Sequence, residues 1–118
     1  MEKLSKTDPL SQKSKAFALR IINLFTYLTN KKEFVISKQI LRSGTSIGAN
    51  IVESKGAVSG PDFANKLSIA LKECLETEYW LDLLFEADFI EERLYKSFMN
   101  DILPIGKMLR KSIKTTRT

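Results

Sequence analysis

The sequence contains no histidine among its 118 residues, and Cys74 is its single cysteine. Catalytic pairs of serine or cysteine with histidine and Glu-x-x-His di-iron sites are therefore excluded, and one cysteine cannot complete a structural zinc site. A lone cysteine also excludes an intramolecular disulfide. We expect no metal and no cofactor. We interpret Cys74 as a small buried hydrophobic residue, with a reactive thiol as the alternative.

Glycine and proline are also scarce, at five and three residues, whereas 43% of the residues are hydrophobic. This composition excludes a disordered chain, because enough apolar surface is present to offset the entropy lost on folding. The length fits one domain over residues 1–118. The first ten residues carry four charges and no apolar run, so we expect neither a secretory signal nor a membrane span, and a cytoplasmic location.

Apolar residues recur at steps of three and four in four long stretches, which is the pattern of amphipathic helices. Asp8 followed by Pro9 is typical of a helix start, as is Ser59 with Asp62. Short connections require antiparallel neighbours, so the predicted fold class is all-α, an up-down-up-down four-helix bundle. The helices are expected over about residues 9–30, 34–54, 61–86 and 91–114.

Two local features refine this prediction. The apolar stripe keeps its phase across Pro104, which predicts a kinked helix in which the carbonyl of Asn100 loses its backbone partner. Gly44 and Gly48 lie four residues apart on one side of the second helix, which predicts close approach of a neighbouring helix. A phosphate-binding loop is disfavoured here, because no Gly-Lys-Ser/Thr run and no preceding strand are present.

Glu78 lies within about 60° of the centre of the third helix's core stripe, at 100° per residue, which predicts a partly buried carboxylate that needs a partner. Arg42, Ser46 and Asn50 on the second helix are the candidate partners. A structural polar network is favoured over catalysis, because one carboxylate without a paired acid or base is a weak active site. The catalytic alternative stays open.

The third helix also carries apolar residues outside its core stripe. A helix that is apolar on two sides usually has neighbours on two sides, and exposed aromatic clusters mark partner surfaces. We therefore predict an oligomer interface with other copies of the chain. Its residues are Ile69, Tyr79, Trp80 and Leu83.

The net charge of +5 is unevenly distributed along the chain. Residues 1–60 carry +6, residues 61–106 carry −6 and residues 107–118 carry +5. This pattern fits cationic surfaces for nucleic acid, or opposite charges that meet between subunits, or solvated helix faces. The candidate nucleic-acid contacts are Lys13, Arg20, Tyr27 and Lys31 on the first helix and Lys107, Arg110, Lys111 and Lys114 on the last.

Four stretches closely resemble the bacterial four-helix-bundle family of 23S rRNA intervening-sequence proteins. They are LRSGTSIGANIVE at 41–53, DF at 62–63, LSIALKE at 67–73 and ETEYWL at 76–81. The resemblance is strongest over residues 34–84 and extends over 9–113. It implies a small cytoplasmic bundle that forms a homo-oligomer, typically a homopentamer, with no established enzymatic activity. The chain differs from many members in having Gly48 where proline is frequent and Pro104 in the last helix. These differences leave the fold in place and the exact bend of the helices open.

The resemblance also suggests partners. Members can be encoded within intervening sequences of large-subunit ribosomal RNA genes, and similar proteins accompany diversity-generating retroelements. The implied partners are therefore RNA or other nucleic acid, a reverse transcriptase or a ribosomal component. Our leading hypothesis is a non-enzymatic homo-oligomeric bundle that binds nucleic acid through its phosphates. The alternative is a protein-interaction scaffold whose charged surfaces serve ring assembly.

Overall fold

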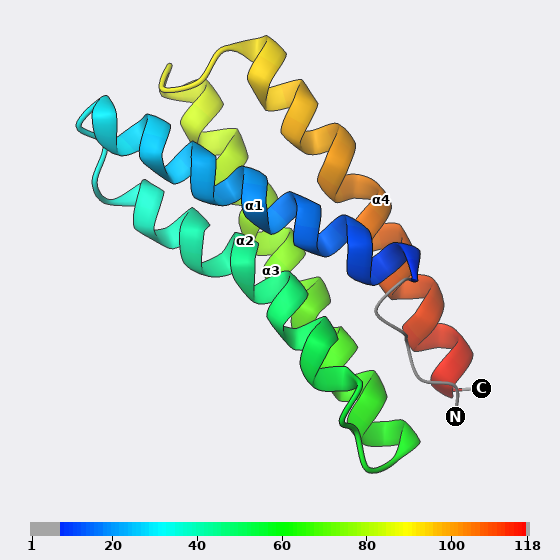
Figure 1. Ribbon diagram of the computed structural model, residues 1–118. Helices are drawn as coiled ribbons and strands as arrows, with labels where there is room; N and C mark the ends of the chain where they lie inside the picture. The colour runs from blue at the N-terminus through cyan, green and yellow to red at the C-terminus, as the bar shows by residue number, and fades with distance from the viewer. Residues whose placement is uncertain (1–7, 118) are drawn as a thin grey trace.

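The computed structural model describes residues 8–117, and these form four helices with no strand among them (Figure 1). The helices are α1 (Pro9–Asn30), α2 (Ile36–Ser54), α3 (Gly60–Glu86) and α4 (Glu92–Arg117). The predicted all-α four-helix bundle is confirmed, with helix ends within three residues of the expected positions. The expectation for residues 1–10 falls largely outside the described residues. None of the described helices combines the length and apolar character that a membrane crossing needs.

The helix starts follow from capping side chains. The Asp8 carboxylate accepts the Ser11 N–H at 2.8 Å, and the Ser59 hydroxyl accepts the Asp62 N–H at 3.2 Å, as the sequence predicts. The start of α2 is different, because Glu33 lies two residues before the helix flank Val35 and accepts N–H donors from residues 35–37. Glu33 is only 8% exposed, so its carboxylate, in place of water, accepts the N–H groups that have no partner within the first turn of α2. This cap was not predicted from the sequence.

The core lies between the apolar stripes of the four helices. α2 packs closely with α1 and α3, and α3 with α4, whereas α1 and α4 have the least contact of the neighbouring pairs. The start of α1 and the end of α4 lie at the same end of this elongated molecule, 45 × 22 × 19 Å (Figure 1). Pro104 lies inside α4 and the helix continues past it, as predicted. The fully buried large side chains include Phe17, Ile21, Leu28, Ile40, Ile47, Ile51, Leu67, Leu81, Ile102, Ile105 and Leu109.

The two glycines of α2 differ in how closely α1 approaches them. A Cβ at Gly44 would lie 2.8 Å from Cγ1 of the buried Ile21, a distance that normal packing does not allow. At Gly48 the nearest atom is the Ser14 hydroxyl at 3.5 Å, an ordinary van der Waals contact. The packing of α1 against α2 therefore requires glycine at position 44, whereas position 48 has room for a methyl group.

Candidate nucleic-acid interface

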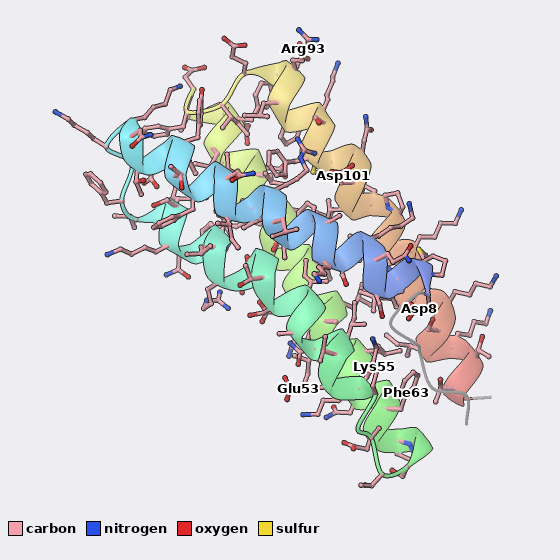
Figure 2. The ribbon with its side chains drawn as sticks, viewed as in Figure 1. Asp8, Glu53, Lys55, Phe63, Arg93 and Asp101 are labelled. Atoms are coloured by element: carbon pink, nitrogen blue, oxygen red, sulfur yellow. The ribbon has the colours of Figure 1, made fainter. Side chains whose placement is uncertain are left out.

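Arg20 lies in the seam between α1 and α4. Its guanidinium donates to the Asp101 carboxylate at 2.5 Å and to the Ser97 hydroxyl at 3.0 Å, and lies 4.1 Å from the centre of the Phe98 ring. Asp101 lies midway along α4 (Figure 2). The ion pair neutralises the cation, and the ring stacks against it. Arg20, predicted as a nucleic-acid contact, therefore joins two helices and has its charge paired within the chain.

The end of α1 is similarly committed to contacts within the chain. The Lys31 ammonium donates to the Phe89 carbonyl at 3.1 Å and lies 4.7 Å from the centre of the Tyr27 ring. The aromatic ring expected to stack on a base therefore has the chain's own cation over it. Lys13, at the other end of α1, is exposed. Of the predicted row on α1, only Lys13 keeps a cation that the described chain does not use.

The cations of α4 are placed differently. Lys107, Arg110, Lys111 and Lys114 are all exposed, and the ion pairs among the described residues use other cations. Their spacing of three, four and seven residues places them along one side of a helix. Figure 2 shows nitrogen-tipped side chains projecting outward from this half of α4. We call these four residues the α4 basic row.

The same side of α4 extends toward its start. Arg93 and Asn100 are exposed and precede Lys107 and Lys114 at intervals of seven residues, about 10.5 Å of helix each. Arg93 projects at the far end of α4 in Figure 2. These two residues were not predicted as contacts from the sequence, although their seven-residue spacing from Lys107 and Lys114 indicates the shared side. The two acidic residues of α4 do not neutralise the row, because Asp101 pairs with Arg20 and Glu92 with Lys96.

The predicted polar network has different pairs. Arg42 forms ion pairs with Glu73, at 3.2 Å, and with Glu76. The Ser46 hydroxyl donates to the Arg42 carbonyl at 2.6 Å, and the Asn50 amide donates to the Ser46 carbonyl at 2.8 Å. Arg42 thus links α2 to α3, whereas Ser46 and Asn50 bond to carbonyls of α2 itself, and none of these contacts involves Glu78.

Glu78 instead faces α4. Burial raises the pKa of its carboxyl group above the ordinary value, Asp82 raises it further, and the charge of Arg110 opposes both. The predicted partnership of Glu78 with α2 is therefore wrong. The helical spacing of 100° per residue placed Glu78 near the core stripe of α3, but it does not determine on which side of that stripe α2 packs. Glu78 therefore has both a second carboxylate, Asp82, and a cation, Arg110, close enough to influence its charge.

Thr77, Ser43 and Cys74 lie in the interior of the bundle. The Thr77 hydroxyl donates to the Ser43 hydroxyl at 2.8 Å, which links α3 to α2 in the core. Burial raises the pKa of the Cys74 thiol to about 12, so the thiol stays protonated and unreactive at neutral pH. The hydrogen bond to Asp82 raises the pKa of Tyr95 to about 12. Residues 8–117 hold no group of three side chains suited to a metal ion.

The predicted oligomer face is only partly open. Tyr79 is 57% exposed, whereas Trp80 packs against the core and donates its indole N–H to Glu76 at 2.9 Å. Ile69 and Leu83 are half-buried. Other apolar side chains are more exposed than these three and were not predicted. They include Leu19, Ile22 and Val52 on α1 and α2, and Leu75 and Leu103 on α3 and α4.

Comparisons with known proteins agree with this architecture. A family model described as 23S rRNA-intervening sequence protein matches residues 8–111. No curated protein matches the chain. A solved structure from Bacteroides thetaiotaomicron VPI-5482, described as a protein with unknown function from the S23 ribosomal protein family, is 57% identical. The match covers 89% of this chain and 98% of that one, with a TM-score of 0.88.

Proposed function

Because the chain belongs to the 23S rRNA-intervening sequence protein family, we propose that it is a non-enzymatic helical bundle that binds RNA or other nucleic acid through the α4 basic row. The supporting observation is the row itself: four exposed cations on one side of a helix, none of them in an ion pair within the described chain. Unpaired surface cations attract phosphates at long range and release counterions on contact.

The arrangement favours recognition of the sugar-phosphate backbone of the nucleic acid over recognition of its base sequence. The row lies on the outward side of a helix that is packed into the bundle, and it contains three lysines, which act as point charges toward phosphate. Four phosphate contacts to a single strand give a slope of log Kobs against log salt of about −3. We therefore expect binding with little sequence preference and strong dependence on salt.

Fluorescence anisotropy of a labelled 20-nucleotide RNA, titrated at several salt concentrations, tests the proposal. We expect measurable binding at low salt and a steep loss of affinity as salt rises. Binding that is undetectable at low salt, or that does not change with salt, contradicts the proposal. A bovine-serum-albumin titration under the same conditions controls for nonspecific adsorption of the dye.

A second function, self-assembly into a scaffold, is favoured by the exposed apolar side chains. Ile22 is 46% exposed on α1 and Tyr79 57% exposed on α3, and exposed apolar patches mark protein interfaces. Because Arg20 is already paired within the chain, its charge does not support this assembly. The support comes from the apolar surfaces.

Light scattering tests self-assembly. We expect a particle mass that is a multiple of 13.4 kDa for the parent chain, and a lower mass for Ile22→Asp or Tyr79→Asp. Lys15→Asp, an exposed residue of the same helix as Ile22, serves as a control for added negative charge. A monodisperse 13.4 kDa parent chain at micromolar concentration contradicts this second function.

A further inference from the structure

A hollow of about 210 Å³ lies between α1 and α4. Its lining residues are Lys13, Ala16, Phe17, Asn100, Asp101 and Pro104. Sites that hold drug-sized ligands have about 300–1,000 Å³. This hollow is smaller, so it suits one planar group of a larger molecule that is held elsewhere.

The chemistry of the hollow combines an apolar floor with a polar rim. The exposed Ala16 and the ring of Pro104 offer apolar surface, and the exposed Asn100 and Lys13 offer hydrogen-bond donors. Pro104 has no N–H, so the Asn100 carbonyl lacks its usual helical donor and remains an acceptor. An apolar surface with donors and acceptors at its edge matches the face and edge of a nucleic-acid base.

The hollow interrupts the cations on the outward side of α4. Lys96 precedes it and Lys107 follows it, and between them this side carries only uncharged residues and the paired Asp101. The distance along the helix from Asn100 to Lys107 is about 10.5 Å. A strand whose phosphates contact the α4 basic row therefore passes the hollow within a nucleotide or two.

We propose that the α1–α4 hollow receives one unstacked base of a single-stranded nucleic acid whose phosphates lie on the α4 basic row. The inference rests on the proposed nucleic-acid binding and specifies its ligand. In a duplex the bases are paired and stacked inside, so only the phosphates reach α4. A single strand can turn one base outward, and such contacts are common where proteins recognise unpaired RNA.

Filling the hollow tests the proposal without changing charge. Ala16 is an exposed helical residue that lines the hollow, and Ala49 is an exposed helical residue on α2 outside it. Ala16→Leu is expected to lower the affinity for a 12-nucleotide single-stranded RNA about fivefold, the low end for one base contact. Ala49→Leu, the matched control, is expected to leave this affinity within about twofold. Circular dichroism melting of both variants verifies that the fold is retained.

Comparing a single-stranded with a double-stranded ligand separates the base site from the proposed phosphate binding. The parent chain is expected to bind the single strand more tightly than a 12-base-pair duplex of the same sequence, and Ala16→Leu to leave duplex affinity unchanged. A 2-aminopurine in the single strand is expected to brighten on binding to the parent and not to Ala16→Leu. Equal binding of both ligands, unaffected by Ala16→Leu, overturns the base site and leaves phosphate binding standing. Absence of binding to either ligand overturns both.

Discussion

The cations of α1 and those of α4 have the same chemistry but different neighbours. Arg20 on α1 and Lys31 directly after it face α4 and the loop before α4, where Asp101 and the Phe89 carbonyl accept their hydrogen bonds. The cations of the α4 basic row are exposed and form no ion pair within the described chain, and only Arg110 among them lies beside a carboxylate of another helix, that of Glu78. A row of positive charge in a sequence therefore indicates a binding surface only when the fold leaves it without acceptors.

The strongest test of this comparison removes charge from the α4 basic row. Lys107→Gln, Lys111→Gln and Lys114→Gln together are expected to weaken RNA binding about 10- to 100-fold at low salt and to flatten the salt slope by about 2, because up to three phosphate contacts are lost. The fold is expected to keep its melting temperature, since these lysines form no ion pair. Fluorescence anisotropy and thermal melting measure the two effects.

The control carries the same change of charge elsewhere. Lys15, Lys32 and Lys38 are exposed residues outside the row, and their combined substitution by glutamine lowers the net charge equally. An equal loss of affinity in the control shows that net charge alone drives binding and that the row has no special role.

The next prediction concerns how α1 is held against α2. Gly44→Ala is expected to destabilise the fold by about 1–3 kcal/mol, because the added methyl group overpacks the buried Ile21. Gly48→Ala is expected to be neutral or to stabilise the fold by up to about 1 kcal/mol, because the methyl group fits and alanine favours helix. Urea unfolding of both variants measures the difference. Equal effects at the two positions contradict the close approach at Gly44.

Arg20→Gln tests the cations of α1 directly. We expect a loss of about 1–2 kcal/mol in the free energy of unfolding, since an ion pair of half-exposed partners contributes up to about 1 kcal/mol and the Phe98 ring about as much again. Affinity for RNA is expected to change less than for any single lysine of the α4 basic row. A variant that unfolds like the parent but binds RNA poorly reverses our assignment of the two rows.

The smallest effect is expected at Glu78, beside Arg110 of the α4 basic row. Its pKa is raised in the folded state, chiefly by burial, so the folded chain holds the proton more tightly than the unfolded chain. The ionised carboxylate therefore lowers stability as pH rises above the ordinary carboxyl range. Glu78→Gln is expected to melt at a higher temperature than the parent at pH 7 and at the same temperature near pH 4. A gain of equal size at both pH values contradicts this explanation.

The helices and their buried faces could be predicted from sequence because both depend on local periodicity. Leu10, Phe17 and Ile21 share one side of α1 whatever lies beside it. The pairing of polar groups could not be predicted in the same way. Arg42 meets Glu73 and Glu76 because of the relative register of α2 and α3, which periodicity within one helix does not determine.

The relative position of neighbouring helices also explains which predicted site residues have other contacts than expected. Arg20 and Lys107 are both polar-face residues of amphipathic helices, and only the position of α4 beside α1 distinguishes them. Trp80 lies off the core stripe in sequence, yet its large ring reaches back to the core and to Glu76. The cap by Glu33 depends on the tight turn between α1 and α2, where Lys32 has a positive φ of 66°.

Lysine footprinting by mass spectrometry tests the central claim most directly, because it compares all lysines in one experiment. The chain is acetylated with and without a saturating single-stranded RNA. We predict that the RNA slows modification of Lys107, Lys111 and Lys114, and that Lys31, already bonded to the Phe89 carbonyl, reacts at the same rate with and without RNA. Protection of Lys31 with unchanged reactivity at Lys107, Lys111 and Lys114 contradicts the account.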